Sequence, residues 1–467
     1  MDAMLRFCAK GVFDMDFEKI CLRLDALVSA GRKSEIRGAL SMLNEVDIAE
    51  YMGTLDNEKV LMVFRLLPKD ISADVFAYMD TDQQSRLMEA MGDNEAMGLI
   101  DEMFVDDAVD LLEELPAGVV RRILMNCDPE KRALINKFLS YPENSAGSIM
   151  TIEYMEFHSG ITVGEAMAEI RRTALDKETI YTLYVMDERR RLIGSIELRK
   201  LLMAHDELRV EEIMDSNVIS VRTLDDQESV ADMVRHYDLM NVPVVDNEGR
   251  LVGIITVDDI MDVIEDENTE DFEKMAAIIP TEDEYMKNSV FTLVKNRIPW
   301  LMILMLSATL TGMIITHFEN ALVGWGSLGV ALTACMPMLM GTGGNCGAQA
   351  STLAIRGLAL GEIKMKDIGQ VLWKEVRVAA LIGVVLGIVN FCRMYFFSDA
   401  GAAVAAVVSA AMFCTIVLAK SIGCTLPIIA KTIKLDPALM ASPIITTVVD
   451  AASLTILFTL ATAVLGH

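Results

Sequence analysis

The sequence predicts a multidomain protein with an all-α superhelical N-terminal domain, an α/β pair of repeats, a long connecting helix and a five-helix transmembrane domain. Three observations support this prediction. Residues 1–296 contain 31 Lys and Arg against 61 Asp and Glu, whereas residues 297–467 contain 10 against 7 and are mostly apolar. Two different internal repeats divide the acidic part. Five apolar stretches in the remainder are each long enough to cross a bilayer.

Residues 1–140 are predicted to form stacked helical hairpins. The stretch LPKDISADVFAYMDTDQQSRLMEAM aligns without gaps with LPAGVVRRILMNCDPEKRALINKFL later in the chain. Pro68 and Pro116 mark a helix start in the two copies, and Asp80 and Asp128 precede the next helix, as helix-end preferences require. Units of helix, turn and helix stack into an α-solenoid.

The stretch 92–115 in this domain contains more acids than solubility requires. A solvated helix face explains them as well as cation binding does, because hard divalent cations prefer carboxylate oxygens. The strong negative charge of the whole N-terminal part argues against nucleic acid as a partner, since phosphate is repelled.

Residues 141–264 contain the second repeat, which is mixed α/β. The stretch YVMDERRRLIGSIELRKLL lines up with PVVDNEGRLVGIITVDDIM. Each copy has an apolar strand, a charged turn, another apolar strand and an amphipathic helix, and each is preceded by a further helix. This order resembles a tandem pair of CBS domains.

One feature of that family is the ending GxxTxxD, which the second copy retains as Gly253, Thr256 and Asp259. The resemblance implies that these residues hold the ribose and phosphate of a nucleotide. The first copy has glutamate and lysine where the second has Thr256 and Asp259. We therefore expect at most one adenine nucleotide, such as ATP, per chain, acting as a weakly bound modulator.

Residues 265–296 are predicted to form the helix that connects the two halves. Its first part is dense in acids, and its later apolar positions, Tyr285, Val290, Leu293 and Val294, fit one face of a helix. A plain charged linker would have a similar composition. The segment is nevertheless the covalent path by which the soluble repeats can act on the membrane half.

The transmembrane domain, residues 297–467, determines the predicted location. Lys and Arg gather before the first apolar stretch and in alternate loops, which places the N-terminus in the cytoplasm and the C-terminus outside. No apolar segment of signal-peptide length occurs near residue 1, which agrees with a cytosolic front half. We expect a multi-pass protein in the cell (inner) membrane, in contact with lipid. The five spans are predicted at 298–318, 325–355, 371–397, 402–430 and 438–465.

Polar residues recur at helical spacing in two of these spans. The second span carries Gly341, Asn345 and Gln349, and the fifth carries Ser442, Thr446 and Asp450. Asp450 is the only charged residue between positions 437 and 466. A lone carboxylate at this depth is costly unless it is paired or faces water. A structural hydrogen bond to a neighbouring helix and attraction of a cation are the two explanations, and Lys420 is interpreted as snorkelling to the interface.

Taken together, the motifs YPENSAGSIMT, VPVVDNEGRLVGIITVDDIMDVIEDE, GTGGNCGAQAST and LDPALMASPIITTVVDAAS resemble the MgtE family of magnesium channels over nearly the whole chain. The resemblance implies a homodimer with its pore at the dimer interface, and a "plug" helix over residues 265–296. It implies that Asp450 binds the permeating Mg²⁺. It also implies that Mg²⁺ bound between acidic cytosolic domains holds the pore shut.

Physical chemistry agrees with these implications. Mg²⁺ loses its water reluctantly, so a pore for it should hold a hydrated ion with few direct ligands. Two Asp450 carboxylates across a two-fold axis would provide them, with Asn345 and Thr446 accepting hydrogen bonds from bound water. Mg²⁺ bridging the acidic domains would cancel their repulsion. The expected regulatory ligands are Asp93, Asp106, Asp107, Asp259, Asp262, Glu265, Asp266, Glu267 and Glu270.

Two other functions fit parts of the sequence. An ion-coupled secondary transporter of divalent cations such as Mg²⁺ or Co²⁺ could use Asp450 as a proton relay. Against this function, the sequence shows a single intramembrane acid without a chain of titratable partners. A membrane-anchored nucleotide sensor that transports nothing would need a complete nucleotide site. An enzyme is not expected, since no nucleophile–base pair or metal-hydrolase spacing occurs.

Overall fold

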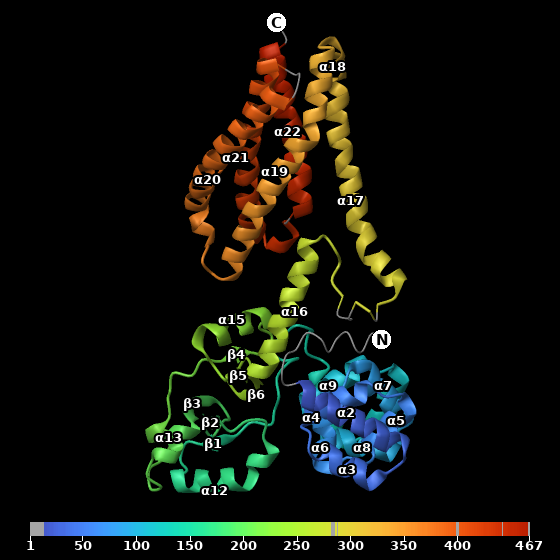
Figure 1. Ribbon diagram of the computed structural model, residues 1–467. Helices are drawn as coiled ribbons and strands as arrows, with labels where there is room; N and C mark the ends of the chain where they lie inside the picture. Colours follow the sequence, from blue (N-terminus) through green and yellow to red (C-terminus); the bar gives the residue numbers. More distant parts are fainter. Residues whose placement is uncertain (1–13, 282–284, 287, 398–400, 441, 466–467) are drawn as a thin grey trace. The chain divides into compact units, whose positions relative to one another are not determined.

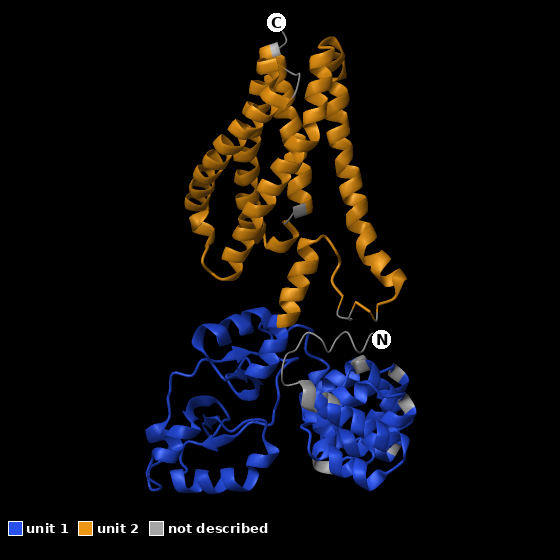
Figure 2. Cartoon of the chain, in the orientation of Figure 1, with its two compact units in different colours: residues 1–264 blue, residues 265–467 orange. Residues whose placement is uncertain are grey.

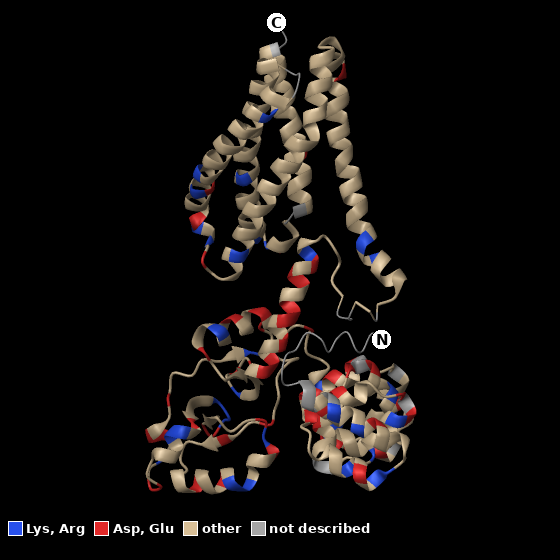
Figure 3. Cartoon of the chain, in the orientation of Figure 1, with Lys and Arg blue, Asp and Glu red and all other residues tan. Residues whose placement is uncertain are grey.

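The computed structural model describes residues 14–281, 285–286, 288–397, 401–440 and 442–465. It contains two compact units, residues 1–264 and 265–467 (Figure 2). Acidic residues are concentrated on the first unit and on the start of the second, and they are sparse on the long helices that follow (Figure 3). This distribution matches the charge division of the sequence.

Short helices make up the N-terminal part of the first unit (Figure 1). Asp80 accepts a hydrogen bond from the N–H of Asp82 at the start of α7, and Asp128 accepts one from the N–H of Glu130 at the start of α11. Both repeats therefore have the predicted Asp cap. The helices are α2 (Asp14–Ser29), α3 (Lys33–Leu40), α4 (Glu45–Gly53), α5 (Asn57–Phe64), α6 (Lys69–Ala77), α7 (Thr81–Ala90), α8 (Asp93–Glu102), α9 (Val105–Glu114), α10 (Ala117–Asn126) and α11 (Pro129–Phe138).

The remainder of this unit consists of two three-stranded sheets of identical topology, ordered β1-β2-β3 and β4-β5-β6. In each sheet the first pair of strands is parallel and the second is antiparallel. The first repeat comprises β1 (Glu156–His158), α12 (Val163–Thr173), a 3₁₀ turn (Ala174–Asp176), β2 (Thr182–Met186), β3 (Leu192–Glu197), α13 (Leu198–Met203) and α14 (Val210–Ile213). The second comprises β4 (Val221–Arg222), α15 (Gln227–Tyr237), β5 (Asn241–Val245), β6 (Leu251–Thr256) and the start of α16 (Val257–Met275).

The two hairpin turns meet each other. The N–H of Leu192 donates to the carbonyl of Gly249 at 3.1 Å, and the N–H of Leu251 donates to the carbonyl of Arg190 at 3.2 Å. Each hairpin turn therefore accepts a backbone hydrogen bond from the strand of the other repeat. Both hairpins carry a β-bulge at the equivalent place, between Val185 and Met186 and between Val244 and Val245.

The helix predicted over residues 265–296 is not continuous. Helix α16 begins in the second repeat and ends at Met275, and the next helix begins at Val290. Ala277 adopts a left-handed φ of 55°, and the N–H of Ile278 returns to the carbonyl of Glu273, which is a typical helix end. Pro280 follows and cannot donate a helical hydrogen bond. Tyr285 therefore lies outside any helix.

The second unit contains five helices among its described residues that are long and apolar enough to cross a membrane, so the prediction of five spans is confirmed. They are α17 (Val290–His317), α19 (Ser327–Ala359), α20 (Ile368–Phe397), α21 (Gly401–Thr432) and α22 (Ser442–Leu465), with the short α18 (Glu319–Gly324) after the first. Helices α19, α21 and α22 share one core that includes Leu339, Ile416 and Phe458.

Candidate functional site

Asp450 lies one-third of the way along α22, where this helix packs on α19. Glycines on α19 permit the close contact. A Cβ at Gly343 would lie 2.8 Å from Cγ1 of Val449, and one at Gly344 would lie 3.0 Å from Cγ2 of Thr446. A side chain at Gly343 would crowd Thr415 on α21 as well as Val449 on α22. The glycines therefore permit the close packing of the helix that carries Asp450.

The carboxylate of Asp450 is half-buried and, within the described part of the chain, has neither a hydrogen bond nor an ion pair. The structural hydrogen bond considered above is therefore not formed by any described residue. The hydroxyl of Thr446, one turn earlier, donates to the carbonyl of Pro443 at 3.0 Å, which leaves its lone pairs available. Asn345, next to Gly344, is exposed. The two packed helices α19 and α22 therefore carry three residues with oxygen acceptors that no described residue occupies fully.

A second intramembrane acid, which the sequence analysis missed, accompanies Lys420. The Nζ of Lys420 on α21 lies 3.5 Å from Oε2 of Glu375 on α20, and the two side chains are 4% and 14% exposed. Lys420 therefore does not snorkel. Because the two charges compensate each other, Asp450 remains without a cationic partner among the described residues.

A cluster of carboxylates occurs in the first unit. It contains Asp106 and Asp107 in the first turn of α9, Asp259 in the first turn of α16, and Glu153 and Glu178 in the segments that flank α12. The Oδ1 atom of Asp106 is buried and has no hydrogen-bond partner among the described residues. Carboxylates from distant parts of the sequence thus lie close together in a partly buried region.

The raised pKa values in this acidic cluster show that ionising these carboxylates is unfavourable. Burial, followed by the charges of Asp107 and Asp259, raises the pKa of Asp106 to about 8. Burial and Asp259 raise the pKa of Asp107 to about 6. Burial, Asp259 and Asp107 raise the pKa of Glu178 to about 7. Burial also raises the pKa of Asp259, although the Thr256 hydrogen bonds oppose this. Ionising these acids together is therefore unfavourable, and a bound cation would relieve that cost.

The acidic cluster is not an assembled metal site. Among the residues that the structure describes, no group of three His, Cys, Asp or Glu side chains is placed to hold a metal ion. The structure brings together Asp106, Asp107 and Asp259 from the expected regulatory ligands. Asp262, Glu265 and Asp266 are exposed farther along α16. The side chain of Asp93 lies outside the described residues.

Farther along α16, Lys274 connects two acids in the second unit. Its Nζ lies 2.7 Å from Oε1 of Glu270 and 2.8 Å from Oδ2 of Asp436, in the loop between α21 and α22. Burial and the charge of Asp436 raise the pKa of Asp271, which lies beside this bridge, to about 6. Asp436 immediately precedes the 3₁₀ turn (Pro437–Met440) that leads into α22. The end of α16 is therefore attached to the chain segment before Asp450.

The nucleotide motif of the second repeat has a structural explanation. The hydroxyl of Thr256 donates to Oδ2 of Asp259 at 2.6 Å, and the N–H of Thr256 donates to the same oxygen at 3.2 Å, which caps the start of α16. A Cβ at Gly253 would lie 2.8 Å from the carbonyl of Thr151. Glycine is thus required for the approach of two backbone segments.

A cleft of about 720 Å³ lies between the repeats, and Gly253, Thr256 and Asp259 are not among the described residues that line it. Its lining includes Tyr181 and Arg199 from the first repeat. An exposed tyrosine before a strand and an arginine after the next strand were the signals in the sequence that could have located it. The size and mixed lining suit a small organic ligand.

Three family profiles match the chain. The profile described as a divalent cation transporter matches residues 336–460, the MgtE intracellular N domain matches residues 43–144, and the CBS domain matches residues 210–266. The chain is 35% identical to the magnesium transporter MgtE of Thermus thermophilus over 95% of its own length and 98% of that protein. It is 31% identical to the magnesium transporter MgtE of Bacillus subtilis over 97% and 99% of the two chains.

Solved structures resemble the soluble part. A crystal structure of the soluble part of a magnesium transporter is 33% identical, with a TM-score of 0.52, and covers 54% of this chain and 99% of its own. A crystal structure of the cytosolic domain of the Mg²⁺ channel MgtE in complex with ATP is 37% identical, with a TM-score of 0.50, and covers 52% of this chain and 99% of its own.

Proposed function

Because the chain belongs to the MgtE family of divalent cation transporters and is a multi-pass membrane protein, we propose that it is a channel for Mg²⁺ uptake that closes when cytosolic Mg²⁺ is high. The unpaired carboxylate of Asp450 carries this proposal. A half-buried acid without a partner in an apolar helix is expensive, and binding a permeating cation is the function that explains it.

The pore lies at a two-fold axis between two copies of the chain, where Asp450 from each copy faces its mate. Mg²⁺ retains most of its water at such a site, since it dehydrates reluctantly. Asn345 and Thr446 then accept hydrogen bonds from that water. The exposed side of α19 that carries Asn345 supports this arrangement, because the described helices of one chain leave it uncovered.

Closure depends on the acidic cluster in the first unit. Asp106, Asp107 and Asp259 repel one another when ionised, and Mg²⁺ between them removes the repulsion. When cytosolic Mg²⁺ falls, the helical domain and the repeats separate. The equilibrium shifts because Mg²⁺ binds the compact arrangement more tightly than the separated one. The remaining acids of α16, including Glu265, Asp266, Glu267 and Glu270, supply further ligands.

The bridge from Lys274 to Asp436 supports a path from this movement to the pore. A displacement of α16 breaks or re-forms this bridge to the loop that precedes α22, and α22 carries Asp450. The ion pair is partly exposed, so the bridge breaks and re-forms at little cost.

A nucleotide acts as a modulator and binds in the cleft lined by Tyr181 and Arg199, not at Thr256 and Asp259. The 37% identical cytosolic domain solved with ATP supports a nucleotide ligand for this part of the chain. The Thr256 hydroxyl is engaged by Asp259, and the neighbouring acids would repel phosphate. The exposed ring of Tyr181 offers a stacking surface.

Proton-coupled transport is the second candidate, because the pair of Lys420 and Glu375 adds a titratable acid inside the membrane half. It predicts that a pH gradient alone drives Mg²⁺ accumulation. A channel predicts flux that follows only the Mg²⁺ gradient and the voltage.

The proposal is tested with purified protein in liposomes. Asp450→Asn retains the shape of the side chain and removes its charge, so we expect a folded protein with strongly reduced Mg²⁺ flux. Thr455→Val is the matched control, since Thr455 is an exposed polar residue of the same helix. If Asp450→Asn conducts Mg²⁺ like the parent and still excludes Na⁺ and K⁺, Asp450 is not the ion site.

A further inference from the structure

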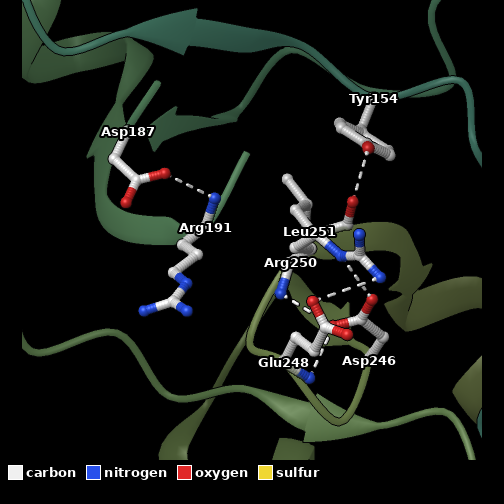
Figure 4. A network of polar contacts seen from close by, with 7 residues as sticks. All are labelled: Tyr154, Asp187, Arg191, Asp246, Glu248, Arg250 and Leu251. Atoms are coloured by element: carbon white, nitrogen blue, oxygen red, sulfur yellow. Dashed lines mark hydrogen bonds and ion pairs between the residues drawn. The ribbon is translucent and has the colours of Figure 1, made fainter. Parts of the chain in front are cut away.

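A second cavity of about 530 Å³ lies on another side of the repeats and has no role in the mechanism above. It is bordered by the end of α11, by the chain around β1, and by the two hairpin turns. Figure 4 shows these turns together with Tyr154. The residues that matter for the argument are Lys137, Lys177, Arg190, Arg250, Tyr154 and Glu156.

The charge of this cavity is opposite to that of the protein. Its lining contains four cationic side chains against the carboxylates of Glu156 and Asp246, although the chain as a whole has a net charge of −27. No described residue forms an ion pair with the ammonium group of Lys137 or Lys177. A local excess of positive charge in so acidic a protein needs an explanation, and an anionic ligand is the simplest.

Each arginine contacts a carboxylate through part of its guanidinium group. The Nη2 of Arg190 lies 3.2 Å from a carboxylate oxygen of Glu156, and the Nε of Arg250 donates to Asp246 at 2.7 Å (Figure 4 shows the second pair). A guanidinium has five N–H donors, so these contacts leave several of them available. Such groups bind phosphate in a bidentate manner.

The backbone at Arg190 gives independent support. Arg190 has a φ of 62°, in the left-handed region that arginine rarely adopts. The equivalent position of the second repeat is Gly249, with a φ of 77°. Glycine is thus the residue this turn favours, and the first repeat has arginine there despite the backbone strain. Such backbone strain is found more often at ligand-binding sites than elsewhere.

Part of the cavity lining is apolar. Tyr154 is buried, with its hydroxyl donating to the carbonyl of Leu251 at 3.3 Å (Figure 4), and Leu134 and Val252 complete the surface. A ligand that fits therefore has an anionic end and a non-polar body. We propose that this cavity binds a small organic phosphate monoester, with its phosphate between Arg190, Lys137 and Lys177 and its body over Tyr154.

The test uses the full chain in detergent and phenyl phosphate as the probe, with calorimetry as the readout and benzoate as the carboxylate comparison. We expect one phenyl phosphate per chain with a Kd below about 1 mM, and weaker binding of benzoate. Arg190→Gly should lower the affinity for phenyl phosphate by about tenfold or more, which corresponds to ~1.4 kcal/mol. Its melting temperature should stay unchanged or rise, since glycine suits this turn.

Two further variants identify the site. Lys137→Glu should weaken binding, whereas Arg121→Glu, the same charge change at an exposed position of α10, should not. Arg199→Ala, in the other cleft, should also leave binding intact. The proposal is overturned if phenyl phosphate does not bind at about 10 mM, a concentration that would detect even very weak binding. It is equally overturned if Arg190→Gly binds like the parent, if Arg121→Glu weakens binding as much as Lys137→Glu, or if Arg199→Ala abolishes it. None of these outcomes affects the Asp450→Asn experiment.

Discussion

Replacing Asp106 by Asn should stabilise the compact arrangement of the first unit in the absence of Mg²⁺. Asn has nearly the shape of Asp and cannot ionise. The pKa of Asp106 rises from 3.8 to about 8 in the compact state, so holding its proton at pH 7 costs up to ~4 kcal/mol relative to the separated state. Burial contributes more to this cost than the charges of Asp107 and Asp259 do, and an Asn amide is buried in the same place, so we expect the substitution to recover about half, or ~2 kcal/mol.

Limited proteolysis of the segment between α11 and β1 measures this difference. Cleavage follows the population of the open form when opening is fast, so ~2 kcal/mol corresponds to roughly 30-fold slower cleavage without Mg²⁺. Added Mg²⁺ should protect Asp106→Asn less than the parent, because part of the repulsion it relieves is already absent. Glu58→Gln, an exposed acid on α5, is the control with the same charge change. Equal cleavage of Asp106→Asn and the parent under both conditions would refute the reasoning.

Three further predictions follow from the same structure. Without Mg²⁺, protease protection of the first unit should fall as the pH rises from about 4 to about 8. The reason is that Asp106 and the other clustered acids have higher pKa values in the compact state than in the separated one. Protection that increases with pH would contradict this prediction. Lys274→Met should make flux less responsive to internal Mg²⁺, as measured in liposomes, because it removes the bridge to Asp436. Lys420→Met should lower the free energy of unfolding in detergent by about 3–5 kcal/mol, because it leaves the buried charge of Glu375 without its partner. The double variant Lys420→Met/Glu375→Gln should recover part of this loss. A double variant no more stable than the single variant would show that the two residues are not coupled.

The fold was predictable where local signals decide it. The five spans follow from hydropathy, and the helical repeat follows from Asp80 and Asp128, whose side chains cap the next helix in the structure. The break after Met275 was missed because the acidic and apolar positions on either side have helical spacing. Pro280 was the available signal, and it carries more weight than the periodicity.

The candidate site was predictable in part. Asp450 is conspicuous because it is the only charge in a long apolar stretch, and its lack of a described partner could not be read from the sequence. The acids of α9 were recognised as numerous, but their burial against Asp259 and Glu178 depends on contacts between distant segments. The pairing of Lys420 with Glu375 was missed for the same reason, since the two residues lie on different helices.

The most direct test of a Mg²⁺ channel closed by its own ion is the Mg²⁺ flux of the parent protein in liposomes, measured while Mg²⁺ on the side of the soluble domains is varied. We predict high flux when that side is depleted and a steep fall as Mg²⁺ is restored, while the gradient across the membrane is kept constant. Flux that does not change with Mg²⁺ on that side, or that appears only with a pH gradient, would contradict the account.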